Sequence, residues 1–316
     1  MPTVAYAGAA YEAVPGESVL DTLLRCGVSV ANSCRAGACQ SCMLRSGSGG
    51  IPPIAQRGLK STLVEQGYFL SCVCEPEGDL AVEPAGGLEI EARVASLERL
   101  TPTVLRARLT PLADMTYRPG QYITLRRGDG LSRSYSLASL PEDGTLELHV
   151  RRAPQGRMSG WLFDEAREGE TVSVRGPAGD CFYTAGKPEQ SLLLAGTGTG
   201  LAPLAGICRD ALRHGHTGPI HLYHGARKAD DLYLQGELGA LAASHTNLRY
   251  EPVVVPDGSS LEHVVGERHA SLAGWRGFVS GNPTMVPLLK KKLFLSGIAS
   301  REIFADAFLE APKPPS

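Results

Sequence analysis

The chain has 316 residues, of which 43% are hydrophobic and 20% charged, and its 31 basic and 33 acidic residues leave a net charge of −2. This length is enough for two or three domains with sizeable cores, because domains usually hold about 100–200 residues. The near-neutral charge, without a long run of Lys or Arg, argues against a nucleic-acid-binding protein. The longest apolar stretches fall short of the roughly 20 residues of a membrane span. The N-terminal residues lack the pattern of an export signal, so we expect a cytoplasmic protein without nucleic-acid or membrane partners.

Residues 1–86 are expected to form a small α/β domain. Apolar residues recur at helical spacing over 17–25, and Gly27 is suited to end that helix. Residues 78–87 are typical of a last strand that runs into a linker, because Pro and Gly follow a short apolar segment.

Four of the eight cysteines stand in a pattern that indicates a metal cluster. Cys34, Cys39 and Cys42 follow C-x4-C-x2-C spacing, and Cys72 and Cys74 come later in the chain. This spacing with a distant fourth cysteine is typical of plant-type [2Fe–2S] ferredoxins. Small residues between the first two thiols let the backbone fold tightly and direct N–H groups at the cluster sulfurs, which stabilises the negative charge of the cluster.

A structural zinc site is the alternative for these thiols, since four thiolates also bind Zn²⁺. A zinc ribbon, however, pairs two C-x2-C knuckles, whereas four residues separate the first pair of thiols here. We therefore favour the iron–sulfur cluster. Cys26, Cys181 and Cys208 lie in apolar surroundings and are expected to be small core residues.

Beyond residue 88 the pattern changes twice. Between 89 and 185, short apolar segments are separated by Gly, Pro and Asp turns, which predicts an antiparallel β-barrel with strands at 104–109, 122–125, 134–138, 146–151 and 171–174. From 187 to 316, strands alternate with helices, which predicts a doubly wound parallel sheet. The expected strands are 191–195, 220–223, 250–255, 277–280 and 303–308, and the expected helices are 202–214, 230–244, 261–269 and 285–296.

The barrel segment contains two motifs suited to an anionic cofactor. The first is Arg133, Ser134, Tyr135 and Ser136; in the second, a strand ends with His149, Val150 and Arg151, and a helix then begins with Gly156, Arg157, Met158 and Ser159. A helix N-terminus offers N–H donors and a favourable dipole to a pyrophosphate. In this order, the two motifs resemble the flavin site of the ferredoxin–NADP reductase superfamily, which implies bound FAD.

The resemblance implies a role for individual side chains. Arg133 would bind the flavin phosphates, because a planar guanidinium binds them bidentately and stays charged. Tyr135 would pack on the isoalloxazine ring, and Ser136 would hydrogen-bond near the N5 atom that accepts hydride. Phe308, in the segment Asp306-Ala307-Phe308, resembles a residue placed near the flavin in such reductases, and packing of this ring into the core is an equally good interpretation.

A glycine-rich loop follows the strand expected at 191–195. Its glycines let the backbone approach an anion and its threonines add donors; the residues are Gly196, Thr197, Gly198, Thr199 and Gly200. The loop differs from the G-x-G-x-x-G fingerprint and resembles the pyridine-nucleotide loop of the same superfamily, which implies an NADH site. Residues beyond two later strands complete that site, namely Arg227, Asp231, Gly281, Asn282, Pro283 and Met285. Ser280 stands where many relatives have Cys.

The order of the three parts resembles the reductase components of bacterial multicomponent oxygenases that act in aromatic hydrocarbon catabolism. This resemblance implies a β-grasp fold for 1–86, Cys72 rather than Cys74 as the fourth cluster ligand, and electron flow from NADH through FAD and the [2Fe–2S] cluster. The partner would be a separate ring-hydroxylating dioxygenase or diiron monooxygenase. Two alternatives remain open: the same electron chain serving a deoxysugar dehydratase or a quinone, and a non-enzymatic metal-binding or sensory protein.

We predict a preference for NADH over NADPH. The 2′-phosphate of NADPH adds negative charge beyond the second strand of the parallel sheet, where Asp230 and Asp231 closely follow Arg227 and would repel it. The kcat/KM values for the two nucleotides are the measurement. A comparable or higher value with NADPH contradicts the prediction.

Overall fold

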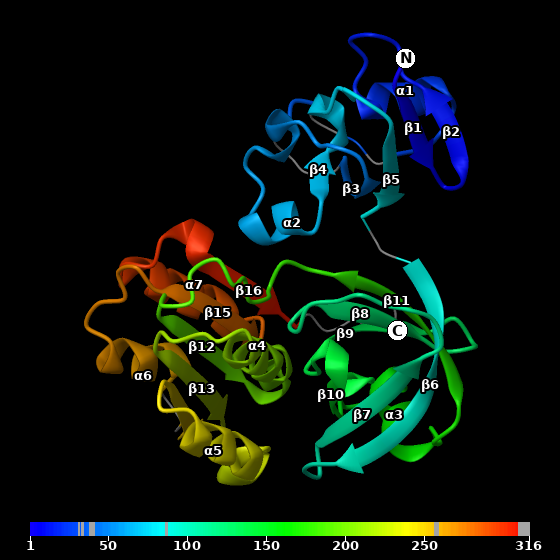
Figure 1. Ribbon diagram of the computed structural model, residues 1–316. Helices are drawn as coiled ribbons and strands as arrows, with labels where there is room; N and C mark the ends of the chain where they lie inside the picture. The colour runs from blue at the N-terminus through cyan, green and yellow to red at the C-terminus, as the bar shows by residue number, and fades with distance from the viewer. Residues whose placement is uncertain (31, 33–34, 38–41, 86–87, 256–258, 309–316) are drawn as a thin grey trace. The chain divides into compact units, whose positions relative to one another are not determined.

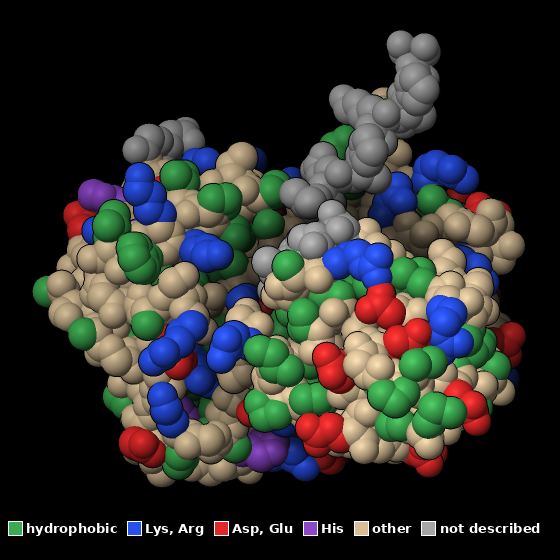
Figure 2. All heavy atoms as spheres, turned by 90° about the horizontal axis from the view of Figure 1, so that it is seen from above, with side chains coloured by type: hydrophobic (Ala, Val, Ile, Leu, Met, Phe, Trp, Pro, Cys, Tyr) green, Lys and Arg blue, Asp and Glu red, His purple; other side chains and the backbone are tan. Residues whose placement is uncertain are grey.

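The computed structural model describes residues 1–30, 32, 35–37, 42–85, 88–255 and 259–308. The chain divides into two compact units, Met1–Gly87 and Leu88–Ser316 (Figure 1). Each unit has apolar side chains packed in a core of its own. Within the described ranges, no helix is long and apolar enough to cross a membrane. The face drawn in Figure 2 carries both basic and acidic side chains between apolar ones, in keeping with the near-neutral net charge.

The first unit is a five-stranded mixed sheet with the order β2-β1-β5-β3-β4. Its central strands β1 and β5 pair in parallel, while the outer pairs are antiparallel. Helix α1 begins after Ser18, whose Oγ accepts a hydrogen bond from Asp21 N, and it buries its apolar side chains in the core. This is the expected β-grasp arrangement. The elements are β1 Thr3–Tyr6, β2 Ala9–Glu12, α1 Val19–Arg25, β3 Met43–Ser48, α2 Ser61–Glu65, β4 Tyr68–Leu70 and β5 Leu80–Pro84.

One cysteine expected in a core is exposed. Cys26 caps the C-terminus of α1, where the chain turns away from the sheet, and its side chain faces solvent. The expectation for Cys26 is therefore wrong, while Cys181 and Cys208 are buried as predicted.

The second unit begins with an antiparallel barrel of six strands in the order β10-β7-β6-β11-β8-β9. A bridge between Leu137, which follows β9, and Leu148 of β10 joins the two edges and closes the barrel. Helix α3 packs Met158, Trp161 and Leu162 against its interior. The barrel elements are β6 Leu88–Arg99, β7 Val104–Pro111, β8 Tyr122–Arg126, β9 Ser132–Ser136, β10 Leu146–Arg151, α3 Arg157–Asp164 and β11 Thr171–Ala178.

The second unit continues with a parallel five-stranded sheet in the order β14-β13-β12-β15-β16. Helices α4 and α5 pack on one face of this sheet, and α6 and α7 pack on the other, as the doubly wound prediction requires (Figure 1). We call this part the α/β half. Its elements are β12 Leu192–Thr197, α4 Leu201–Arg213, β13 Ile220–Ala226, α5 Gln235–Ser244, β14 Leu248–Val254, α6 Leu261–Arg268, β15 Arg276–Gly281, α7 Met285–Leu295 and β16 Ile303–Ala307.

The helix expected at 230–244 is broken at its start. A single 3-10 turn, Ala229–Asp231, precedes α5, and Leu234 between them adopts a left-handed backbone conformation with φ of 57°. A leucine in this conformation is uncommon, because its Cβ crowds the following carbonyl. The break leaves Tyr233 outside the helix, with its side chain buried.

Candidate functional site

The motif strand of the barrel meets the strand at the edge of the parallel sheet. Ser136, at the end of β9, donates a hydrogen bond from Oγ to Oδ2 of Asp306 in β16 at 2.8 Å. Burial raises the pKa of the Asp306 carboxyl, and the Ser136 hydrogen bond opposes that shift. Two residues on, the backbone N–H of Phe308 donates to the Gly281 carbonyl at 2.8 Å. Residues predicted for flavin and for nucleotide binding therefore lie together.

The other residues of the β9 motif are turned outward. Arg133 and Ser134 are exposed, while Tyr135 is half-buried and packs against the barrel core. Burial raises the pKa of the Tyr135 hydroxyl. An exposed guanidinium close to an aromatic ring on one strand suits the phosphates and the ring system of a flavin nucleotide.

The three predicted residues of strand β10 lie in different surroundings. Val150 lies in the barrel core and Arg151 is exposed. His149 is buried, with Nε2 at 3.0 Å from Glu147 Oε1 and Nδ1 at 3.0 Å from the Tyr233 hydroxyl. Of the three side chains, Arg151 is the one placed to contact an external ligand.

The turn before α3 requires glycine at its first position. A Cβ on Gly156 would overlap Ser159 Oγ and approach Ala153 Cβ to 2.8 Å. Ser159 Oγ accepts from Ala153 N at 3.1 Å and donates to Gly156 O at 3.2 Å, which closes the turn. Arg157 is exposed and Met158 is buried. The tight turn presents the first backbone N–H groups of α3 as an anion cradle, and the Ser159 side chain maintains that cradle.

The glycine-rich loop packs directly on the backbone of β15. A Cβ on Gly196 would approach Ser280 O to 2.8 Å, and a Cβ on Gly200 would overlap the same carbonyl. Gly281, at φ of 120°, is in similar contact with the Thr197 backbone, and Asn282 N donates to Thr197 Oγ1 at 3.3 Å. The predicted loop and the Gly281–Asn282 segment therefore form one surface at the carboxyl ends of β12 and β15, where α/β sheets bind ligands.

Ser280 lies beneath this surface and is fully buried. Its Oγ has no hydrogen-bond partner within the described part of the chain. Buried hydroxyls normally have a hydrogen-bond partner. A buried hydroxyl without one, beside the glycine-rich loop, therefore fits a site in which a bound polar ligand supplies the partner. This observation agrees with the pyridine nucleotide expected from the sequence.

The remaining nucleotide residues lie around this surface at the ends of β13 and β15. Arg227 and Asn282 are exposed, Asp231 and Pro283 are half-buried, and Met285 is buried at the start of α7. Thr199 is also buried, and Gly198 turns the loop with φ of 53°.

Two of the predicted cluster ligands lie in contact. The Sγ atoms of Cys42 and Cys72 are 3.2 Å apart, and Cys34 and Cys39 lie outside the described residues. A Cβ on Gly37, which has φ of 71°, would lie 3.3 Å from the Val73 side chain, so this loop passes close to Cys72. By contrast, Cys74 is fully buried in the core, and burial raises the pKa of its thiol to about 12.

Sequence reasoning missed three residues that the structure places at or beside the site. Asp306 is the carboxylate that Ser136 contacts, and in the sequence it stands out only through its place before Phe308 in the terminal segment. The structure pairs it with Ser280 in the β15–β16 register. Glu147 and Tyr233, which hold His149, carry no local motif.

Comparisons with known proteins follow the same division of the chain. Family models match residues 3–77 (2Fe-2S iron-sulfur cluster binding domain), 92–183 (oxidoreductase FAD-binding domain) and 194–290 (oxidoreductase NAD-binding domain). The ferredoxin–NAD(P)+ reductase component of the naphthalene 1,2-dioxygenase system of Pseudomonas putida is 34% identical, covering 93% of this chain and 94% of its own length. The chain belongs to the oxygenase reductase components of the ferredoxin–NADP reductase superfamily.

Two further relatives extend the agreement. The reductase subunit of an aromatic O-demethylase from an Amycolatopsis species is 36% identical over 98% of each chain. A crystal structure of an Amycolatopsis cytochrome P450 reductase shares 32% identity with a TM-score of 0.68, covering 98% of this chain and 99% of that one. The protein is an NADH-dependent oxidoreductase, and its cofactors are a [2Fe–2S] cluster, FAD and the nicotinamide nucleotide. The non-enzymatic alternative is thereby set aside.

We predict that Cys72→Ser removes the cluster from this reductase and that Cys74→Ser largely preserves it. Cys72 lies beside Cys42, whereas the buried and protonated thiol of Cys74 packs in the core. Iron content per chain and the electron paramagnetic resonance signal of the reduced protein are the measurements. Loss of iron in Cys74→Ser with retention in Cys72→Ser would reverse the assignment.

Proposed function

We propose that this reductase takes electrons from NADH where the barrel meets the α/β half and delivers them, through the cluster of its first unit, to a separate oxygenase component. The observation that carries the proposal is the 2.8 Å hydrogen bond from Ser136 to Asp306, because it joins the flavin motif to the nucleotide surface. Bound FAD supplies the conversion between the two-electron chemistry of NADH and the one-electron chemistry of the cluster. We propose domain limits of 1–86, 89–185 and 187–316.

In this proposal the side chains of the barrel hold and orient the flavin. Arg133 and Arg151 are exposed cations for its phosphates, and the α3 N-terminus accepts the pyrophosphate. Tyr135 flanks the ring, and Ser136 presents its hydroxyl toward the ring edge while Asp306 fixes the direction of that hydroxyl. Phe308, tied through its backbone to Gly281, covers the site and excludes water from it.

The α/β half holds the nucleotide. The backbone N–H groups between Gly196 and Gly200 cradle its pyrophosphate, and the dipole of α4, which starts at Leu201, adds to the attraction. The Ser280 hydroxyl, which has no hydrogen-bond partner among the described residues, would lie under the nicotinamide. Asn282, Pro283 and Met285 form the wall beyond β15, and Arg227 and Asp231 approach the adenosine end.

We propose an oxygenase as the acceptor because the relatives serve oxygenase systems. The naphthalene relative favours a ring-hydroxylating dioxygenase, and a diiron monooxygenase is the other acceptor implied by the sequence. A cytochrome P450 is a third candidate, favoured by the solved structure of an Amycolatopsis cytochrome P450 reductase at 32% identity. The thiol ligand set suits a reducing compartment, so we propose the cytoplasm as the location.

A fragment that begins at Leu88 tests this route of electrons. Both parts of the second unit have their own cores, so the fragment is expected to fold and to bind FAD. NADH should still bleach its flavin absorbance at a rate near that of the full chain, and ferricyanide should still be reduced.

Reduction of cytochrome c and turnover with an oxygenase should fall sharply in the same preparation, because these acceptors draw on the cluster. Equal loss of ferricyanide and cytochrome c reduction would contradict the expectation that NADH reduces the flavin of the second unit without the first unit. Cytochrome c reduction at the rate of the full chain would contradict the role of the cluster as the electron donor to that acceptor.

We predict that Ser136→Ala slows flavin reduction by NADH roughly 10-fold to 100-fold. A hydrogen bond to a charged group contributes about 1.5–3 kcal/mol, and about 1.4 kcal/mol corresponds to a factor of ten in rate. The matched control is Ser139→Ala, since Ser139 is also buried but contacts Tyr117 and Glu147 N. Stopped-flow bleaching of the flavin is the measurement, and similar rates in the two variants would exclude the role given to Ser136.

A further inference from the structure

Helix α4 of the α/β half packs closely against the barrel near Gly120 and Gly206. At Gly206 of α4, a Cβ would lie 3.0 Å from the Leu137 and Ala138 carbonyls. Beside this contact lies a cavity of about 600 Å³ between barrel strands β7 and β10 and helices α4 and α5. Apolar packing crosses this seam at Val104 of β7, which lies in the core of the α/β half, and polar contacts across the seam also hold the two halves together.

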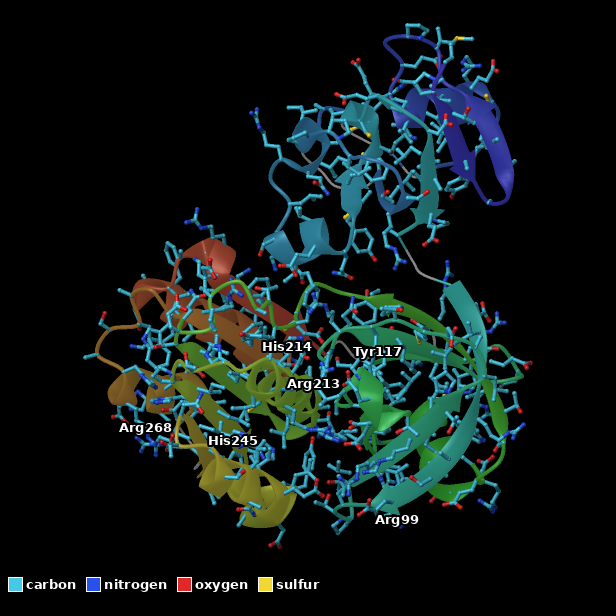
Figure 3. All side chains as sticks on the ribbon, viewed as in Figure 1. Arg99, Tyr117, Arg213, His214, His245 and Arg268 are labelled. Carbon is cyan, nitrogen blue, oxygen red and sulfur yellow. The ribbon has the colours of Figure 1, made fainter. Side chains whose placement is uncertain are left out.

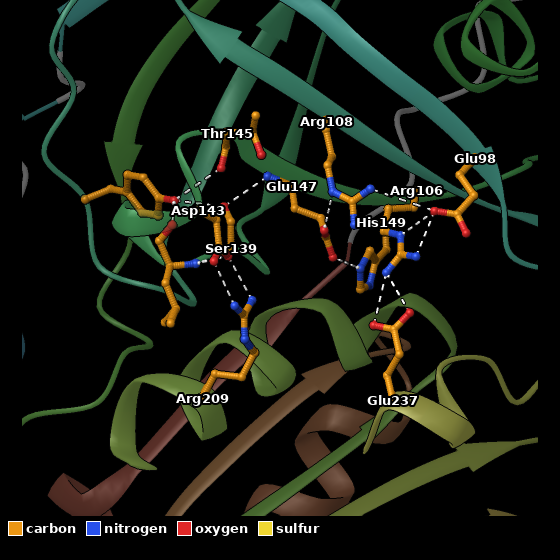
Figure 4. A network of polar contacts seen from close by, with 12 residues as sticks. Glu98, Arg106, Arg108, Ser139, Asp143, Thr145, Glu147, His149, Arg209 and Glu237 are labelled. Atoms are coloured by element: carbon orange, nitrogen blue, oxygen red, sulfur yellow. Dashed lines mark hydrogen bonds and ion pairs between the residues drawn. The ribbon is translucent and has the colours of Figure 1, made fainter. Parts of the chain in front are cut away.

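Three of these polar contacts are ion pairs. Arg209 binds Asp143 through two hydrogen bonds of 2.8 and 2.9 Å, and Arg106 binds Glu237 at 3.0 Å (Figure 4). Arg213 also pairs with Glu142; Figure 3 labels Arg213 in α4 and Tyr117 in the barrel. The Arg209–Asp143 and Arg213–Glu142 pairs are solvent-accessible, and such pairs contribute little to stability and are weakened by salt.

A fourth contact is buried and connects β10 to the segment before α5. Tyr233, 3% exposed, has its hydroxyl 3.0 Å from His149 Nδ1, and the two rings meet edge to face. On its other side, His149 Nε2 lies 3.0 Å from Glu147 Oε1, and Arg108 Nε donates to Glu147 Oε2 at 2.9 Å.

The charge on Glu147 sets the direction of these hydrogen bonds. Burial disfavours the carboxylate, but the hydrogen bond with His149 and the neighbouring Arg108 and Arg106 charges outweigh it and lower the pKa of Glu147 to about 2. The ionised carboxylate accepts a hydrogen bond from Nε2–H of His149. In the neutral imidazole, Nδ1 is then the acceptor for the Tyr233 hydroxyl.

Tyr233 also touches the nucleotide surface. Its ring packs edge to face on His224, at 5.2 Å between centroids. His224 is fully buried in β13, which pairs in parallel with β12 so that His224 lies beside Gly196, the first residue of the glycine-rich loop. A continuous set of contacts therefore runs from the flavin strand β10 through Tyr233 and His224 to the phosphate loop.

We propose that Tyr233 is a positioning residue for hydride transfer, whose hydroxyl, held by His149, sets the distance between the nucleotide loop and the flavin-bearing barrel. Hydride transfer requires donor and acceptor atoms in close contact, and a displacement of about 1 Å costs up to about 100-fold in rate. Because a cavity flanks the seam, the loss of this hydrogen bond lets the α/β half turn about the Gly206 contact.

The chain contains a matched control for this residue. Tyr223 is 1% exposed, and its hydroxyl lies 2.9 Å from His269 Nε2, again with edge-to-face rings. Both partners belong to the α/β half, on the sheet face that α6 and α7 cover. Tyr223→Phe therefore removes the same kind of buried Tyr–His hydrogen bond without affecting the seam.

The test compares Tyr233→Phe with Tyr223→Phe in the FAD-loaded full chain. We expect the limiting rate of flavin bleaching by NADH to fall about tenfold in Tyr233→Phe and to stay within twofold in Tyr223→Phe. Reoxidation of the reduced protein by ferricyanide should be unchanged in both. A rate for Tyr233→Phe within twofold of the parent, or equal slowing in both variants, overturns the proposal.

Hydrogen exchange on FAD-free protein gives a readout that does not depend on activity. Amides of β10 and of residues 229–234 should exchange faster in Tyr233→Phe than in the parent protein. In Tyr223→Phe their exchange rates should be unchanged. Unchanged exchange in both segments of Tyr233→Phe overturns the proposal. Should Tyr233→Phe fail to fold, Glu147→Gln takes its place, because it weakens the hydrogen bond between Glu147 and His149. This variant should slow flavin bleaching at least threefold. An unaltered rate overturns the proposal.

Discussion

The close backbone contact between the glycine-rich loop and β15 is the constraint on which the site depends. No side chain fits at Gly196 or Gly200, because the Ser280 carbonyl occupies the space that a Cβ would need. This contact fixes the carboxyl ends of β12 and β15 side by side, and β16 pairs with β15 in register, so that Asp306 lies next to Ser280. From that position Asp306 reaches Ser136 of the barrel. A short run of glycines thereby determines where the two halves of the catalytic region meet.

Much of the fold was predictable because its elements carry strong local signals. Strand β10 agrees with its expected limits, and the helices of the α/β half end within one or two residues of the expected positions, since each follows a buried apolar strand. Strand β6 was missed although its residues alternate, because small Ala side chains and charged residues weaken its apolar pattern. The break before α5 was missed because a leucine in the left-handed region depends on tertiary packing.

The candidate site also combines features that have a local sequence signal with features that depend on tertiary packing. Its glycines, arginines and motif serine were predictable, because phosphate binding imposes a local pattern on the chain. The contacts between motifs were not, since Ser136 and Asp306 are 170 residues apart and His149 and Tyr233 are 84 apart. The thiols show the same limit: Cys72 and Cys74 are two residues apart, and their different burial follows from packing of the whole first unit.

The position of Asp306 in the sequence has a consequence for how the enzyme is made. A ribosome synthesises the barrel and the nucleotide loop before it reaches β16, because chains are extended from the N-terminus. A growing chain can therefore fold a flavin pocket while Ser136 still lacks its carboxylate partner and Phe308 is not yet in place. A chain that has not yet added β16 therefore holds the flavin motif and the glycine-rich loop but lacks the contact that joins them.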